Sequence, residues 1–312
     1  CNGRRRTWLE TKDRIARAAG ALQKIGFGGG KRVAILGMNS DRYYECFFAA
    51  SWAGGEVVPL NIRWSVPELA YSLNDSGAEI LVFDHIFADQ AFKLKSEAKG
   101  IRHYIYIGEQ EAPAWAGDYE ALLNDASPAE DAERSGDDVF GIFYTGGTTG
   151  FPKGVMLTHA GLWTSSVSAA LDIDINETCS YMHCAPMFHL ADVAMSVAST
   201  IVGATQAFIP AFNADLVVKT IGQEKVSHTL LVPSMIKMLL ASPALEGGDM
   251  SSLKRIVYGA SPIPEAVLLE AIERLPHCGL VQAYGQTELS PLITILRPEY
   301  HVKGGAKLRS AL

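Results

Sequence analysis

The residues whose types and spacing most clearly indicate chemistry lie between Tyr144 and Val155. This stretch reads Tyr-Thr-Gly-Gly-Thr-Thr-Gly-Phe-Pro-Lys-Gly-Val and follows an apolar run typical of a strand, Val139 to Phe143. Glycines let backbone N–H groups approach a polyanion, threonine hydroxyls add donors, and a lysine supplies positive charge for phosphate. A surface turn needs only one or two glycines, whereas this stretch has four. We therefore expect a triphosphate-binding loop between a strand and a helix.

The loop departs from the common phosphate-loop pattern. Gly150 is followed by Phe151 and Pro152 before Lys153, and Gly154 stands where a Ser or Thr would follow the lysine. An ordinary P-loop NTPase is therefore disfavoured. Because the loop alone would suit a kinase, a ligase or a binding module, the rest of the sequence must decide the reaction.

Two downstream segments narrow the choice. The first reads Tyr-Gly-Ala-Ser-Pro from Tyr258, and the second reads Gln-Ala-Tyr-Gly-Gln-Thr-Glu and ends at Glu288. An acid beside a triphosphate would repel the phosphates unless a hard cation lay between them, so Glu288 indicates magnesium. Tyr284 offers a flat face for a purine, and Thr287 adds a hydroxyl.

In order and spacing, these three segments closely resemble the signature motifs of the adenylate-forming superfamily, which includes acyl-CoA synthetases, luciferases and peptide-synthetase adenylation domains. Pro186 to His189 resembles the aromatic–histidine segment beside that superfamily's acyl-carboxylate pocket; the alternative for His189 is a core histidine with a backbone partner. The resemblance implies an α/β fold with two mainly parallel sheets flanked by helices. It covers nearly the whole chain, as an incomplete N-terminal AMP-binding domain over residues 1–312.

The resemblance also implies a reaction in two steps. A substrate carboxylate attacks the α-phosphorus of ATP, which gives an acyl-adenylate and pyrophosphate, and a thiol then takes the acyl group. The expected small-molecule partners are a carboxylic acid, ATP and coenzyme A, with Mg²⁺ as the metal. No protein nucleophile is needed, so catalysis would depend on positioning and charge neutralisation.

The resemblance assigns roles to individual residues. The expected ATP-binding residues of the loop are Thr145, Gly146, Gly147, Thr148, Thr149, Gly150 and Lys153. Those of the downstream segments are Gly259, Ala260, Ser261, Gln282, Ala283, Tyr284, Gly285, Gln286 and Thr287. Lys153, Thr287 and Glu288 are the expected catalytic residues, Thr145 and Glu288 the metal site, and Phe188, His189 and Gly259 the acid pocket. Gly146 stands where many members carry Ser or Thr, which removes one donor.

The elements expected around these residues alternate between strand and helix. A capping box at Thr7 begins an amphipathic helix that Gly26 ends, and a buried strand follows at 32–36. Arg4 to Arg6 is expected as a solvated strand after a hairpin turn. The acidic stretch 109–138 is expected as a surface connection, which gives approximate subdomains of 1–137 and 138–312.

Composition limits the class of partner. A formal charge of −7 and a pI near 5.6 do not indicate a nucleic-acid or anionic-membrane surface. The longest apolar stretch, 191–212, is interrupted by polar residues and predicts no membrane span. Five unpaired cysteines favour a reducing, cytoplasmic compartment. The spacing of Cys179, His183, Cys184 and His189 matches no zinc module, so the cysteines are expected in the core.

Several alternatives stay open. Segments rich in Met, Ala, Val and Phe between Met187 and Leu240 favour an aliphatic acid, and hence fatty-acid or lipid metabolism, with an aryl acid as the alternative. A peptide-synthetase adenylation domain is less favoured. Such a domain usually places an Asp early in its amino-acid pocket to hold the ammonium group, and Asp192 is the only nearby candidate in the sequence. A non-catalytic nucleotide-binding module is the alternative from another class, and a homodimer is left open.

Both ends of the printed sequence look cut. The superfamily's ribose-binding Asp and its small C-terminal domain with a catalytic Lys would follow the last printed residue. We therefore expect these 312 residues alone to bind ATP weakly at most and to form no thioester at a useful rate.

Overall fold

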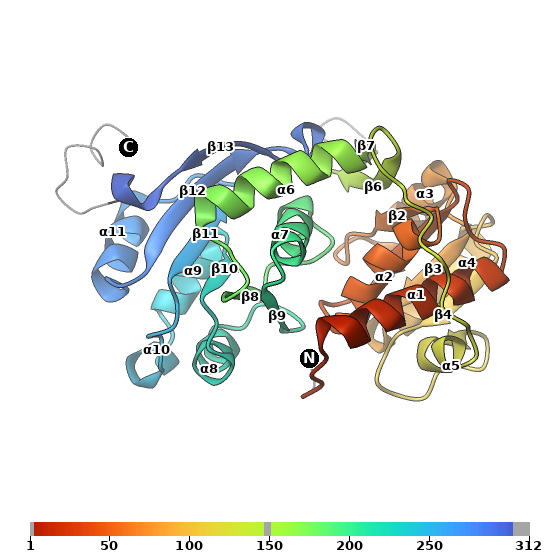
Figure 1. Ribbon diagram of the computed structural model, residues 1–312, viewed down its shortest axis with the longest axis horizontal. Coiled ribbons are helices and arrows are strands. Elements are labelled where there is room, and N and C mark those ends of the chain that lie inside the picture. The colour runs from red at the N-terminus through yellow and green to blue at the C-terminus, as the bar shows by residue number, and fades with distance from the viewer. Residues whose placement is uncertain (1–2, 147–150, 302–312) are drawn as a thin grey trace. The chain divides into compact units, whose positions relative to one another are not determined.

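The computed structural model describes residues 3–146 and 151–301, which form two compact units (Figure 1). The N-terminal unit comprises residues 3–161 and 187–189, and the C-terminal unit comprises residues 162–186 and 190–301. Each unit is built on one sheet, so each can be described by itself. Residues 138–161, which the sequence pattern grouped with the second subdomain, belong to the N-terminal unit because their strands join its sheet.

The N-terminal sheet has seven strands in the order β5-β4-β3-β1-β2-β6-β7. They are β1 (Arg32–Leu36), β2 (Glu56–Pro59), β3 (Ile80–Phe83), β4 (His103–Tyr106), β5 (Gly117–Asp118), β6 (Val139–Thr145) and β7 (Lys153–Thr158). All neighbours run parallel except β6 and β7, which form an antiparallel pair. Because parallel strands end at the same edge, their carboxyl ends collect on one side of the sheet.

Helices cover both faces of this sheet. They are α1 (Trp8–Lys24), α2 (Asp41–Trp52), α3 (Val66–Ser76), α4 (Ala88–Glu97) and α5 (Tyr119–Asn124). Leu73 of α3 and Leu94 of α4 pack with Ala34 of β1 on one face. The alternate strand residue Val33 lines a small apolar cavity with Ala18 of α1 and Leu123 of α5 on the other face. The strand alternation thus supplies both apolar faces that the helices bury.

Local signals fix the first helix as expected. The Thr7 side chain accepts from the backbone N–H of Glu10, and the Glu10 carboxylate accepts from the backbone N–H of Thr7, which completes the capping box. Gly26 follows the helix with a φ of +82°, a conformation that favours glycine. The helix start and stop predicted from sequence are therefore confirmed.

Two expectations for this unit are wrong. Arg4 and Arg6 are partly buried in a segment without strand pairing, and both guanidinium groups form ion pairs with Asp41 of α2. The stretch 109–138 is more than a connection, because it contains β5 and α5. Burial of Tyr119 and Leu123 holds that short helix against the core.

The element after the glycine-rich loop also differs from expectation. Residues 153–158 form β7, which pairs with β6 so that Thr145 lies opposite Lys153. The expected helix, α6 (His159–Ile173), begins only after this strand. Exposed Met156 and buried Leu157 show the alternation of a strand, which was overlooked because the resemblance to phosphate loops suggested a helix.

The C-terminal sheet has six strands in the order β13-β12-β11-β10-β8-β9. They are β8 (Ser180–His183), β9 (Thr205–Phe208), β10 (His228–Leu230), β11 (Arg255–Gly259), β12 (Gly279–Gly285) and β13 (Leu292–Leu296). Only β13 runs antiparallel, against β12. The helices are α6, α7 (Leu190–Ile201), α8 (Ala214–Glu224), α9 (Pro233–Leu240), α10 (Ala244–Gly247) and α11 (Glu265–Arg274).

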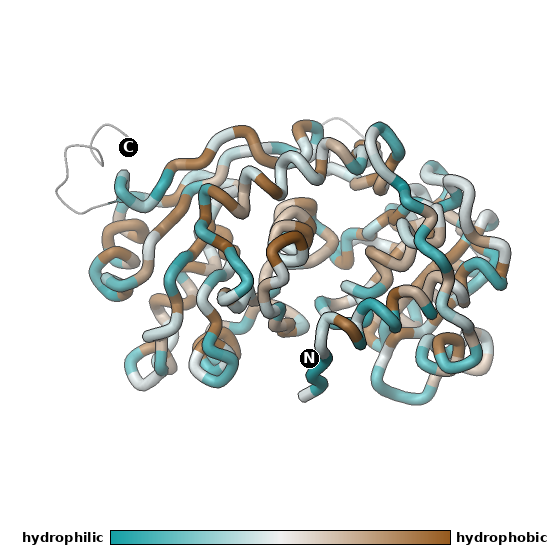
Figure 2. Tube along the Cα trace, in the orientation of Figure 1, coloured by the Kyte–Doolittle hydropathy of each residue, from teal (hydrophilic) through white to brown (hydrophobic). Residues whose placement is uncertain are grey.

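Neighbouring residues of a strand pack on opposite faces of this sheet. Ile256 of β11 packs with Ile221 of α8 and Leu268 of α11, whereas the next residue, Val257, packs with Met195 of α7. The largely hydrophobic course of α7 is visible in Figure 2. The predicted fold class, two mainly parallel sheets flanked by helices, is confirmed.

Two further expectations concern burial. Among the cysteines that the structure describes, Cys46, Cys179, Cys184 and Cys278 are all buried and unpaired, which confirms their predicted core positions. Within residues 3–146 and 151–301, no helix is both long and apolar enough to cross a membrane.

Candidate functional site

The glycine-rich loop lies at the turn of the β6–β7 hairpin in the N-terminal unit. Thr145 ends β6 and is half-buried, Lys153 begins β7 and is exposed, and the two are direct partners in the ladder. Gly146 is exposed, and a Cβ built on it would have no atom within 4 Å. Among the described residues, nothing would therefore obstruct a Ser or Thr side chain at this position. The predicted residues Gly147, Thr148, Thr149 and Gly150 lie outside the described residues.

Both flanks of this loop contact the same helix, α3. On one flank, the Tyr144 hydroxyl donates to Oδ2 of Asp75 at 2.6 Å. On the other, the ring of Phe151 stacks on Tyr71, with ring centroids 4.6 Å apart. Burial and the Asp75 carboxylate raise the pKa of the Tyr144 phenol, so it is a donor throughout the physiological range. Sequence reasoning missed Tyr71 and Asp75, although their i, i+4 spacing places them on one face of α3.

The second and third motifs lie side by side in the C-terminal unit. β11 ends at Gly259 and β12 at Gly285, and Gly259 pairs with Ala283 in the parallel ladder. A Cβ on Gly259 would lie 2.1 Å from the carbonyl oxygen of Ala283, so only glycine allows this approach. Ala260 has a φ of +64°, a rare conformation for a residue with a Cβ. Such backbone strain is often held at functional sites.

The end of β12 presents its side chains outward. Tyr284 is 63% exposed, and the antiparallel ladder between β12 and β13 shifts register between Tyr284 and Gly285. A Cβ on Gly285 would lie 1.7 Å from the carbonyl oxygen of Pro291, so the bulge requires glycine. Thr287 and Glu288 follow in a short 3₁₀ helix, with Thr287 half-buried and the Glu288 side chain exposed. The third motif therefore places an aromatic face, a hydroxyl and a carboxylate at one strand end.

The remaining residues predicted to bind nucleotide surround this strand end. Gln282 and Ala283 are half-buried within β12, whereas Ala260, Ser261 and Gln286 are exposed. The structure thus brings all the downstream nucleotide-binding candidates to the carboxyl edge of β11 and β12, the edge where parallel α/β sheets bind ligands.

The aromatic–histidine segment belongs to the N-terminal unit. Phe188 is buried and His189 exposed, and their ring centroids are 4.2 Å apart. The backbone N–H of Met187 donates to Oδ1 of buried Asn39 at 2.8 Å. The exposure of His189 excludes the core-histidine alternative. Sequence reasoning missed Asn39, because a partner so distant in sequence leaves no local signal.

Asp192 has a structural role rather than the ammonium-binding role considered from sequence. It is fully buried, and its carboxylate accepts from Tyr181 Oη at 3.1 Å and lies 2.8 Å from Nδ1 of His183. Both carboxylate oxygens are therefore engaged within the protein. Asp192 is therefore not available to bind the ammonium group of an amino-acid substrate, and the interpretation as a peptide-synthetase adenylation domain loses its candidate residue.

The acidic side chains could hold magnesium only if the phosphates of a bound substrate supplied further ligands. The described residues contain no cluster of three or more His, Cys, Asp or Glu side chains that could hold a metal. Mg²⁺ commonly uses one or two carboxylates and takes its other ligands from waters and substrate phosphates. The exposed Glu288 fits that donor set.

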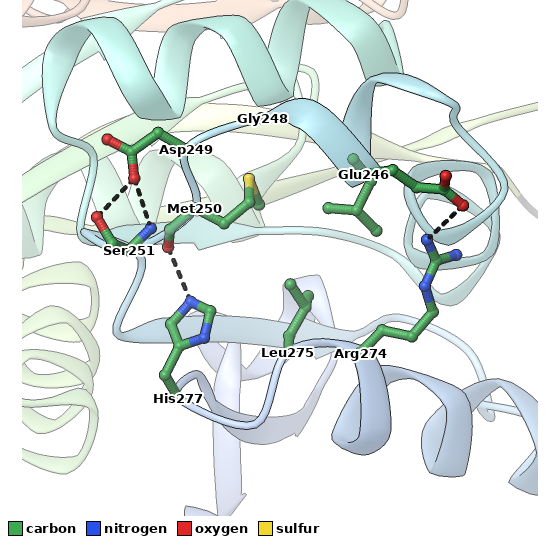
Figure 3. Close-up of a pocket in the computed structure, with 9 residues that line it drawn as sticks. Glu246, Gly248, Asp249, Met250, Ser251, Arg274, Leu275 and His277 are labelled. Atoms are coloured by element: carbon green, nitrogen blue, oxygen red, sulfur yellow. Dashed lines mark hydrogen bonds and ion pairs between the residues drawn. The ribbon is translucent and has the colours of Figure 1, made fainter.

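The C-terminal unit also has an open hollow of about 590 Å³, shown in Figure 3. Its lining residues include Met250 and His277, which precede β11 and β12, so it lies at the amino ends of these strands. His277 Nε2 bonds to the Met250 carbonyl at 2.8 Å, and Arg274 faces Glu246. These polar groups thus bind one another, and the hollow lies at the opposite edge of the sheet from the second and third motifs.

Comparison with known proteins agrees with this geometry. The AMP-binding enzyme family matches the chain over residues 1–309. A feruloyl-CoA synthase from Amycolatopsis is 34% identical over 93% of this chain and 56% of that protein. A long-chain-fatty-acid–CoA ligase from Thermus thermophilus is 33% identical over 93% of this chain and 53% of that protein. The inhibitor-bound N-terminal domain of FACL13 from Mycobacterium tuberculosis matches with a TM-score of 0.87 and 28% identity, covering 96% of this chain and 73% of that one.

The chain thus spans about half the length of these two curated relatives. The superfamily resemblance drawn from the three motifs is confirmed, and both relatives are acyl-CoA ligases. The chain belongs to the AMP-binding enzyme family.

Proposed function

We propose that this chain binds ATP and a carboxylic acid as part of an AMP-forming acyl-CoA ligase. The observation that carries the proposal is the position of the three motifs, each at the carboxyl end of a strand. Thr145 ends β6, Gly259 ends β11 and Gly285 ends β12. The similarity to two CoA ligases supports the same reaction class.

In the proposed reaction, the chain orients the reactants and stabilises charge. Lys153 and the loop bind the β- and γ-phosphates, while Gly259 to Ser261 and Tyr284 bind adenine. An oxygen of the acid attacks the α-phosphorus, the bond to the β-phosphate oxygen breaks, and pyrophosphate leaves. The thiol sulfur of coenzyme A then bonds to the acyl carbon, loses its proton and displaces AMP. Mg²⁺ held by Glu288 would neutralise phosphate charge.

For the acid, we propose an aliphatic substrate, with an aryl acid as the second candidate. Apolar residues on α7 and α9, including Met195 and Ile236, agree with an aliphatic acid, although both also serve the core. The 34% identity to a feruloyl-CoA synthase favours the aryl alternative. The test is pyrophosphate release by the whole protein with ATP, Mg²⁺, coenzyme A and short, medium, long-chain and aryl acids. Release with none of these acids would refute the ligase assignment.

Lys153→Ala is expected to raise the KM for ATP by about tenfold or more, because a charge-assisted phosphate contact is worth about 1.5–3 kcal/mol. The side chain is exposed at the start of β7, so the melting temperature should stay within about 2 °C of the parent's. Lys93→Ala, which removes an exposed lysine from α4, is the matched control and should leave ATP kinetics unchanged. Parental ATP kinetics in the Lys153 variant would remove this residue from the mechanism.

His189→Ala is expected to change the relative kcat/KM values for different acids by about threefold or more, while the KM for ATP stays constant. The reason is that an exposed ring beside the acid should contact the acid and not the nucleotide. His85→Ala, at an exposed position of the same unit, is the control. Equal losses with every acid would argue against a role in acid recognition.

A further inference from the structure

A buried histidine–carboxylate pair in the C-terminal unit joins β8 to α7. His183 is the last residue of β8, Asp192 is the third residue of α7, and both side chains are fully buried. Nδ1 of His183 lies 2.8 Å from Oδ2 of Asp192, and Nε2 lies 2.9 Å from Oε1 of Gln206 on β9. Both ring nitrogens therefore face oxygen atoms.

The orientation of the Gln206 amide follows from the position of a single proton. The Thr200 hydroxyl lies 2.6 Å from the carbonyl oxygen of Ser196, a distance that requires the hydroxyl proton between the two oxygens. Thr200 Oγ1 can then only accept from Gln206, whose Nε2 lies 3.1 Å away. The amide nitrogen points to Thr200, so the amide oxygen points to His183 and must accept from its Nε2.

The other ring nitrogen also meets an acceptor. Asp192 Oδ1 accepts from the Tyr181 hydroxyl, whose pKa is raised far above its usual range by burial and by the Asp192 charge. Asp192 Oδ2 is left to bond Nδ1 of His183, and as a carboxylate, the form that the first turn of α7 favours, it accepts from that nitrogen. A neutral imidazole carries only one N–H and would set a nitrogen lone pair against an oxygen, which is costly in the interior. An imidazolium satisfies both contacts.

The surroundings suit a cation. The Phe208 ring stacks on His183 with centroids 4.6 Å apart and an interplanar angle of 8°. The nearby thiol of Cys184 adds no competing charge, because burial raises its pKa to about 12. Asp192 lies in the first turn of α7, where the helix dipole favours a carboxylate.

We propose that His183 is held as an imidazolium and that its ion pair with Asp192 is a positioning device for the connection 184–189. This connection leaves β8 directly after His183 and enters α7 two residues before Asp192, so the pair ties its two ends together. It carries Phe188 and His189. The effect on acid selection rests on the proposed ligase function, whereas the charge state of His183 does not.

The charge state is tested by ¹⁵N-detected NMR of the histidine rings in the folded protein at about pH 7 to 8, where a free imidazole is mostly neutral. We expect His183 to show two protonated nitrogens with slowly exchanging protons, and both signals should vanish in His183→Gln. Buried His228 on β10 is the internal control, because burial lowers its pKa to about 4 and it should show one N–H. A single N–H for His183 would overturn the proposal.

The positioning role is tested by His183→Gln, Asp192→Asn and the double variant, with His228→Gln as the matched control. Each variant of the pair should shift the ratio of kcat/KM between two acids by about threefold or more, at constant KM for ATP. The double variant should shift it no further than the singles, because the residues act as one unit. Unchanged ratios in an active parent, or an equal shift in the control, would refute the role. An inactive parent would refute the ligase function alone, and NMR would still decide the charge of His183.

Discussion

Glu288→Gln is expected to lower kcat/KM for acyl-adenylate formation by about tenfold or more. Glutamine keeps the shape of the exposed side chain but removes the charge that we propose to lie beside Mg²⁺ and the triphosphate. ATP–pyrophosphate exchange measured against Mg²⁺ concentration should show a higher half-saturating concentration. The fold should be intact, because the 3₁₀ helix Thr287–Leu289 buries none of its residues.

Glu299 provides a closely matched control. Like Glu288, it is an exposed glutamate in the middle of a three-residue 3₁₀ helix of the same unit, Pro298–Tyr300. Glu299→Gln should therefore leave both the exchange rate and the magnesium titration unchanged. A magnesium titration of Glu288→Gln that coincides with that of the parent would count against coordination, whether direct or through water.

Gly285→Ala is expected to lower the free energy of unfolding by at least about 2 kcal/mol and to abolish measurable adenylation. The added Cβ would lie 1.7 Å from the carbonyl oxygen of Pro291, which is backbone and cannot rotate away. Relief would require β12 to separate from the chain that enters β13, which would move Tyr284 and Glu288 from their positions. Urea unfolding and ATP–pyrophosphate exchange measure the two effects.

Gly247→Ala is the control for this substitution. Gly247 belongs to α10 of the same unit, and a Cβ there would meet nothing within 4 Å. Alanine has a helix propensity about 1 kcal/mol better than glycine, so this variant should be as stable as the parent or slightly more so. Equal unfolding midpoints for the Gly285 variant and the parent would show that the bulge accommodates a side chain.

Features of the fold that depend on near neighbours were predictable from sequence. The capping box joins Thr7 to Glu10, and apolar strands such as 32–36 are marked by their own composition. Features set by distant partners were not. The Arg4 ion pair joins residues 37 positions apart, and no local pattern reveals that Asp41 lies opposite. The hairpin at β7 was missed for another reason, because an expected helix outweighed a visible alternation.

The features of the candidate site also divide into those predictable from sequence and those set by distant partners. Motif chemistry identified Lys153, Tyr284 and Glu288 because their residue types are informative in themselves. The need for glycine at 259 and 285 arises from carbonyl groups on neighbouring segments, which only the folded chain brings near. The hydrogen bond from Met187 to Asn39 spans 148 positions and was likewise invisible in the sequence.

Because both flanks of the glycine-rich loop contact α3, a movement of that helix would move both flanks. Tyr71 contacts Phe151, and Asp75 binds Tyr144, so neither end of the loop can move without the helix. A small rotation of α3 about its axis would carry Tyr144 and Phe151 in the same direction. A displacement of α3 would therefore shift the two flanking residues together rather than move them apart.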